Sequence, residues 1–115
     1  MAKFMFLQRG GCENRQEMTP EQMEAGMKAW MEWVKNGTEE GWLLDPGSPL
    51  SGKGAVVQPD LSVIDGPFAE SKDLVGGYTI VEASDLPAAC ELAKQTITLA
   101  GGGNIEVREF ANFGQ

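Results

Sequence analysis

Histidine is absent from this chain of 115 residues. Its absence excludes Ser-His-Asp and Cys-His nucleophile pairs, histidine zinc sites and the commonest general base. The two cysteines, Cys12 and Cys90, lie far apart and form neither a CxxC pair nor a disulfide framework, so reduced thiols are expected. Any acid-base chemistry must therefore come from Asp, Glu, Lys, Tyr or Cys.

Long apolar runs and an excess of positive charge are also missing. No run approaches the roughly 20 apolar residues of a membrane span, and MAKFMFLQRGG lacks the apolar stretch of a signal peptide. Lys and Arg number 9 against 17 Asp and Glu, a net charge of -8, which repels nucleic acid and anionic membranes. We expect a cytoplasmic protein with neither partner, built as one domain over residues 1–115.

The first half of the sequence predicts a strand followed by a helix. Residues 3–8, KFMFLQ, are apolar on both faces, which is typical of a central strand covered on two sides. TPEQ at 19–22 is a capping-box pattern that begins a helix, and Asn36-Gly37 predicts its end. Trp33 lies off the apolar stripe and is expected to face a partner or a cleft. That stripe, the expected core face, consists of Met23, Met27, Trp30, Met31 and Val34.

The second half predicts short strands and one more helix. WLL at 42–44 reads as an edge segment before a mobile surface loop, and GAVVQ and LSVID form a hairpin around Pro59-Asp60. GGYTIVEA alternates with period two and predicts a longer strand. After it, Ser84 or Asp85 caps a helix, and NIEVREF closes the chain as a strand. The core side of this helix is expected to carry Leu86, Ala89, Cys90, Ala93, Ile97 and Ala100.

The order is β-α-β-β-β-α-β, or β-α-β-β-α-β when the hairpin and the long strand are grouped. This order predicts the α+β class and a ferredoxin-like antiparallel sheet with two helices on one face. The other face has no cover within one chain. We therefore expect a homodimer in which two sheets close into an α+β barrel.

Ionisable residues cluster around Asp65-Gly66-Pro67-Phe68. Asp before Gly-Pro is turn chemistry, so Asp65 alone has a structural explanation of equal weight. Glu70, Lys72 and Asp73 follow within a few residues in a loop ahead of a strand, which favours a polar site. The next pair, Gly76-Gly77, predicts a close backbone approach or a bulge rather than a phosphate loop.

Glu106 and Arg108 are two residues apart on the last strand and should share the face opposite Ile105 and Val107. They form either a salt bridge at the interface or part of a ligand site. Tyr78 is chiefly an aromatic strand residue whose hydroxyl could reach the same space.

DGPFAESKDLVGGYTIVEA, followed one helix later by GGGNIEVRE, resembles the YCII-related proteins and in particular their DGPF-motif branch. The resemblance implies a ferredoxin-like fold, a dimeric α+β barrel and a pocket beside the DGPF loop at the dimer interface. It also implies a bacterial protein of a group whose activities are mostly unassigned, some members being encoded near extracytoplasmic-function sigma factors. Some YCII-related proteins use a His-Asp pair, and one lineage dehydrochlorinates an aromatic ring. This chain can keep only the Asp, at Asp65.

Two functions remain open. The favoured one is a small-ligand-binding or regulatory dimer, because no nucleophile lies next to a base in the sequence. The alternative is a small enzyme acting on a compact polar or aromatic metabolite, with Asp65 or Glu70 as general base and Lys72 or Arg108 holding an anionic group. Tyr78 and Glu106 complete the candidate ligand-binding residues, and neither a metal nor a cofactor is expected.

Overall fold

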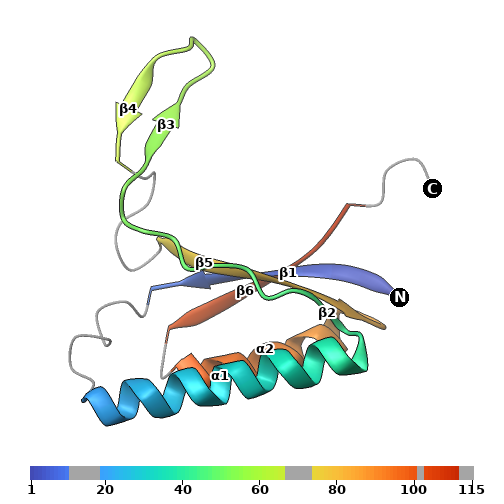
Figure 1. Ribbon diagram of the computed structural model, residues 1–115. Coiled ribbons are helices and arrows are strands. Elements are labelled where there is room, and N and C mark those ends of the chain that lie inside the picture. Colours follow the sequence, from blue (N-terminus) through green and yellow to red (C-terminus); the bar gives the residue numbers. More distant parts are fainter. Residues whose placement is uncertain (11–18, 67–73, 101–102, 112–115) are drawn as a thin grey trace.

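The structure is a computed structural model, and it describes residues 1–10, 19–66, 74–100 and 103–111. The elements along the described chain (Figure 1) are β1 (Ala2–Arg9), α1 (Pro20–Glu40), β2 (Leu43–Asp45), β3 (Ala55–Val57), β4 (Val63–Asp65), β5 (Val75–Ala83), α2 (Leu86–Ala100) and β6 (Asn104–Glu109).

Four strands form one antiparallel sheet in the order β2-β5-β1-β6, and β3 and β4 form a separate hairpin. Both helices lie on one face of the four-stranded sheet, and the hairpin rises from the other side (Figure 1). The α+β class, the antiparallel sheet and the hairpin are as the sequence predicts. The first strand is central, but helices cover only one of its faces.

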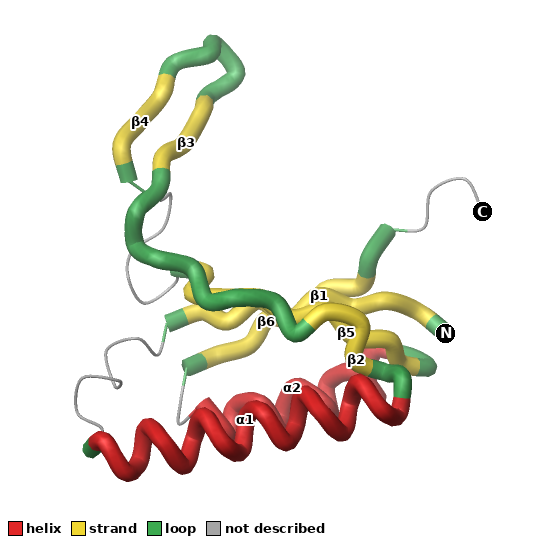
Figure 2. The backbone as a smooth tube through the Cα atoms, in the orientation of Figure 1, coloured by secondary structure: helices red, strands yellow, loops and turns green. Residues whose placement is uncertain are grey.

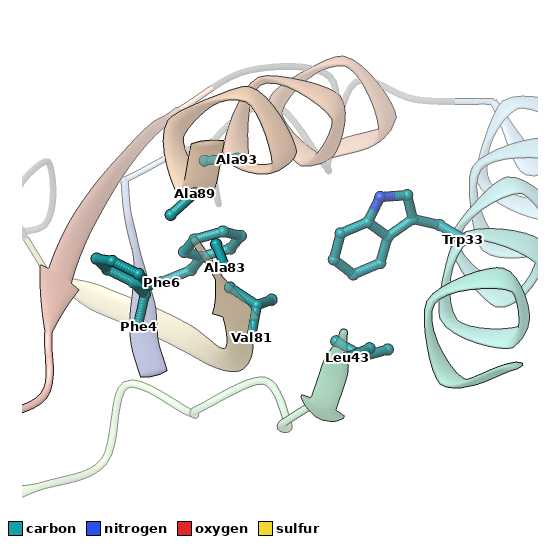
Figure 3. Close-up of a cluster of buried hydrophobic side chains, with 8 residues drawn as sticks. All are labelled: Phe4, Phe6, Trp33, Leu43, Val81, Ala83, Ala89 and Ala93. Carbon is teal, nitrogen blue, oxygen red and sulfur yellow. The ribbon is translucent and has the colours of Figure 1, made fainter. Parts of the chain in front are cut away.

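The core lies between the sheet and the helices (Figure 3). Phe4 and Phe6 of β1 and Val81 of β5 are almost completely buried, because alternate residues of these strands point toward the helices. Ile105 and Val107 of β6 pack against the same core. The two-residue alternation predicted for β5 and β6 is therefore confirmed. The remaining core side chains are Trp33, Leu43, Ala83, Ala89 and Ala93.

The start of α1 follows its capping box. The Thr19 hydroxyl accepts a hydrogen bond from the Gln22 backbone N–H, the Gln22 side chain accepts one from the Thr19 N–H, and Pro20 occupies the first turn. The predicted end at Asn36-Gly37 is wrong, because α1 continues to Glu40 and ends at Gly41 with φ 88°. Gly37 serves packing instead: a Cβ there would lie 2.8 Å from the Trp42 ring.

The buried face of α1 matches the predicted stripe only in part, since Trp30 and Val34 pack against the core as predicted. Met23, Met27 and Met31 are exposed, whereas Trp33 is buried at 8% exposure. Trp33 stacks on Trp30, meets Trp42 edge to face, and donates from its indole N–H to the Gln95 side chain of α2 at 2.9 Å. A tryptophan ring buries more apolar surface than a methionine, so the helix turns its tryptophan side inward.

In α2, Asp85 is the capping residue, since its side chain accepts a hydrogen bond from the Ala88 N–H. Ala89 and Ala93 are buried as predicted. Leu86 and Ile97 are instead exposed, and Thr96 is buried in their place because its hydroxyl donates to the Ala93 carbonyl. Cys90, predicted to be a core residue, is only partly buried.

A close approach at the start of β5 fixes the loop that follows β2. The β1–β5 register skips Gly76, so Gln8 pairs with Gly77 and Arg9 with Val75, which confirms the predicted bulge. The Leu50 N–H donates to the Gly76 carbonyl, and Pro49 forms an isolated antiparallel β-bridge with Gly77. The loop predicted to be mobile is thus hydrogen-bonded along β5 through its first half.

Candidate functional site

The sheet face away from the helices, here the open face, carries most of the described candidate residues. Strand register aligns its side chains in rows across β5, β1 and β6. Tyr78, Leu7 and Glu106 form one row, and Ile80, Met5 and Arg108 form the next. The structure therefore brings Tyr78, Glu106 and Arg108 onto one face, as the sequence predicts.

A charged cluster lies where β1 and β6 meet. Arg9 donates from Nε to Glu106 Oε1 at 2.7 Å, and Arg108 donates from Nη1 to Glu106 Oε2 at 3.1 Å. Arg9 and Glu106 are about one-third exposed, but Arg108 is 68% exposed. The cluster thus places two guanidinium groups around one carboxylate, with Arg108 reaching furthest into solvent.

Arg9 is the member of this cluster that sequence reasoning missed. The sequence does contain a signal for it. Arg9 lies an even number of residues from Met5 and Leu7 along the strand, so its side chain must share their face of β1. The pairing of β1 with β6, which brings residues 97 apart in sequence together, is what adds Glu106 to it.

The two arginines fix the protonation state of Glu106. Hydrogen bonds from Arg9, and then from Arg108, hold the pKa of the Glu106 carboxyl below its usual range. A carboxylate with a lowered pKa is a poor proton acceptor near neutral pH. The cluster is therefore suited to binding through charge and hydrogen bonds rather than to general-base catalysis by Glu106.

The residues around the DGPF motif are only partly described. Asp65 is exposed on β4, at the base of the hairpin and opposite Ala55. Among the described residues no hydrogen bond or ion pair joins Asp65 to Glu106 or Arg108. Glu70, Lys72 and Asp73 lie outside the described residues, as does Cys12, so their predicted roles stay predictions.

The described part of the chain holds no group of three or more Cys, Asp or Glu side chains placed to bind a metal ion. Neither α1 nor α2 is both long and apolar enough to cross a membrane. A shallow surface groove runs along the outer face of α1, away from the sheet, and it is lined by Glu24, Met27, Lys28, Met31, Glu32 and Lys35.

Comparisons with known proteins give a fold and a family. No curated protein matches the sequence. A similar solved structure is 5-chloro-2-hydroxyhydroquinone dehydrochlorinase from Burkholderia phenoliruptrix AC1100, in complex with 2,5-dihydroxybenzoquinone. The two chains superpose with a TM-score of 0.57 at 15% identity, over 96% of this chain and 94% of the other.

That identity supports a shared fold and carries no function to this chain. The family follows from the sequence itself. The model of the YCII-related domain matches residues 3–113, nearly the whole chain. Together with the antiparallel sheet and its two helices, this match shows that the chain belongs to the YCII-related family.

Proposed function

We propose that this protein is a homodimer that binds a compact anionic ligand at the Arg9–Glu106–Arg108 cluster of the open face, in a binding or regulatory role. The observation that carries the proposal is the arrangement of Arg108. It donates to Glu106 from one guanidinium nitrogen and is 68% exposed, whereas a guanidinium carries five N–H donors. The donors that point to solvent fit a carboxylate or an acidic hydroxyl.

The local charge supports the same ligand class. The exposed guanidinium of Arg108 gives the solvent side of the cluster a cationic surface, although the chain as a whole has a net charge of -8. Such a cationic site on an acidic surface favours small anions over extended polyanions, because the surrounding surface repels a long polyanion. Tyr78 lies in the same row as Glu106, with Leu7 between them. It gives the face an aromatic side chain on which a flat ligand could pack.

The proposed dimer rests on the apolar part of the open face. Met5, Leu7 and Ile80 lie there without a helix above them among the described elements, and a second copy is the simplest cover. The strand order β2-β5-β1-β6 agrees with the ferredoxin-like plan. In such a dimer the two sheets would enclose the charged cluster in an α+β barrel.

Titration calorimetry with two probes tests the binding site. Benzoate supplies a carboxylate on a ring, and 2,5-dihydroxybenzoquinone supplies acidic hydroxyls on a flat ring and is the ligand of the dehydrochlorinase of similar fold. We expect at least one of them to bind, and Arg108→Gln to weaken that binding by about tenfold or more.

Lys94→Gln is the matched control. Lys94 is as exposed as Arg108 and makes one comparable ion pair, at 2.9 Å to Glu91 on α2. Binding that the Arg108 change leaves intact, or that both changes weaken equally, would contradict a site at Arg108. If neither probe binds at millimolar concentration, the proposed ligand class is contradicted.

A second candidate is a small enzyme that acts on such a ring with Asp65 or Glu70 as the base. One observation favours it, namely that the similar solved structure is a dehydrochlorinase of a hydroxylated ring. Incubation of the protein with 5-chloro-2-hydroxyhydroquinone, followed by chloride release, is the direct assay. Turnover that Asp65→Asn abolishes would establish the enzyme, and a ligand that binds without turnover would favour the binding protein.

A further inference from the structure

The β3–β4 hairpin, residues 54–66 and here termed the arm, stands away from the body of the molecule (Figure 2). Its base is closed by the Gly66 N–H donating to the Gly54 carbonyl, and Val56 and Ile64 pair across it. Val57 and Val63 are more than 60% exposed. An isolated two-stranded hairpin is marginally stable in water, so an apolar arm of this kind needs a surface to pack on.

The tip of the arm is a hydrogen-bonded turn that presents a leucine. Leu61 is 82% exposed and has φ 72°, in the left-handed region that bulky residues avoid. Its N–H donates to the Gln58 carbonyl, and the Gln58 N–H donates to the Ser62 carbonyl. The Ser62 backbone and hydroxyl both donate to Asp60 Oδ1. The turn is thus held by its own hydrogen bonds in a shape that glycine would adopt with less strain.

A leucine that is 82% exposed at a positive φ buries little apolar surface and adds backbone strain in a single chain. Glycine or asparagine would fill the same backbone position at lower cost. The leucine is explained if it is an anchor that enters an apolar surface, because rigid apolar anchors lose little entropy on binding.

Charge indicates which surface receives the arm. Asp60 and Asp65 are the charged residues of the arm, so it is purely acidic. Most of the chain is acidic as well, with a net charge of -8. The open face departs from this excess, because among its described strand residues the cations Lys3, Arg9 and Arg108 equal the acids in number and lie around Met5, Leu7 and Ile80. The acids of this face are Asp45, Glu82 and Glu106.

The direction of the arm adds a geometric reason. The arm rises on the side of the sheet opposite the helices, which is the side where a second copy would lie in the proposed dimer (Figure 1). An arm that leaves one sheet on that side extends past its own open face and toward the partner copy.

We infer that the arm of one copy docks on the open face of the second copy, with Leu61 packed against the apolar residues beside the Arg9–Glu106–Arg108 cluster. Each ligand site is then walled by the arm tip of the partner and is incomplete in a single chain. This inference rests on the proposed dimer, and it makes the arm the segment by which one copy recognises the other. By symmetry, each dimer contains two such exchanged contacts.

The test is sedimentation equilibrium of wild type, Leu61→Gly and Leu61→Asn. Both replacements suit a positive φ, so the fold and the turn should be kept or improved. We expect wild type to be a dimer, and we expect the dimer Kd of both variants to be raised about tenfold or more. At concentrations low enough to dissociate wild type as well, the variants should unfold at a temperature no lower than that of wild type.

Leu50→Asn is the matched control, because Leu50 is also an exposed loop leucine, at 50% exposure, but lies on the body of the molecule beside β5. It should change the dimer Kd by no more than about twofold. A wild-type dimer that Leu61→Gly and Leu61→Asn leave unchanged would overturn arm docking and leave the proposed dimer standing. A wild type that is monomeric at all concentrations would overturn both.

Discussion

Single backbone positions decide how the segment after β2 is placed. Gly47 has φ 75°, and a Cβ built on it would lie 1.6 Å from the Tyr78 carbonyl oxygen. The Gly47 N–H also donates to Asp45 Oδ1, and the Thr79 hydroxyl donates to the Pro46 carbonyl. Glycine at this position therefore holds the loop against β5, next to the strand that carries Tyr78.

We predict that Gly47→Ala lowers the free energy of unfolding by about 2 kcal/mol or more, because alanine is strained at positive φ and its Cβ overlaps the backbone of β5. Urea denaturation measures the change. Gly52→Ala is the control, since nothing lies within 4 Å of a Cβ there. It should stay within about 0.5 kcal/mol of wild type. Equal losses from both replacements would show that Gly47 does not fit against β5 as described.

At the scale of elements, α1 has two apolar faces with different roles. One face places Trp33 in the core against α2, and the other exposes Met23, Met27 and Met31 over the surface groove. Periodicity alone detects both faces but does not rank them. The larger aromatic surface decides which one is buried.

We predict that Trp33→Ala lowers the free energy of unfolding by about 3 to 5 kcal/mol, through the cavity and the lost bond to Gln95. Met27→Ala should change it by less than about 0.5 kcal/mol, because the side chain is 61% exposed and alanine favours helix. Urea melts followed by circular dichroism measure both. A large loss from Met27→Ala together with a small one from Trp33→Ala would mean that α1 is rotated about its axis.

For the whole molecule, the open face is where pH should act. The pKa of Glu106 is lowered in the folded chain by Arg9 and Arg108. A depressed carboxyl pKa contributes stability that is fully present above the unfolded-state value and is lost as pH falls through the folded-state value. The cluster therefore favours the folded chain at neutral pH and ceases to do so in acid.

We predict that the thermal stability of wild type falls more steeply than that of Glu106→Gln between about pH 6 and pH 3, because glutamine has no proton to take up there. The comparison of slopes cancels the response of the other carboxylates. Parallel pH profiles for the two proteins would contradict a stabilising Arg9–Glu106–Arg108 cluster.

Local patterns in the sequence predicted the features that depend on neighbouring residues. The capping box at Thr19, the alternation of β5 and the Pro59-Asp60 turn are all decided within a few residues by hydrogen bonding and backbone preference. The family could be recognised for the same reason, since its motif is contiguous. These features are independent of what the rest of the chain packs against.

The tertiary structure decided the features that depend on distant partners. Gly37 continues α1 rather than ending it, because Trp42 and Leu43 occupy the space that a side chain at this position would fill. Trp33 is buried, rather than the methionines, because α2 supplies Gln95 and the core supplies its apolar contacts. Arg9 joins the candidate site only when β1 pairs with β6. Which face of a helix is buried, and which charges meet, are properties of packing between elements, and no local pattern in the sequence contains them.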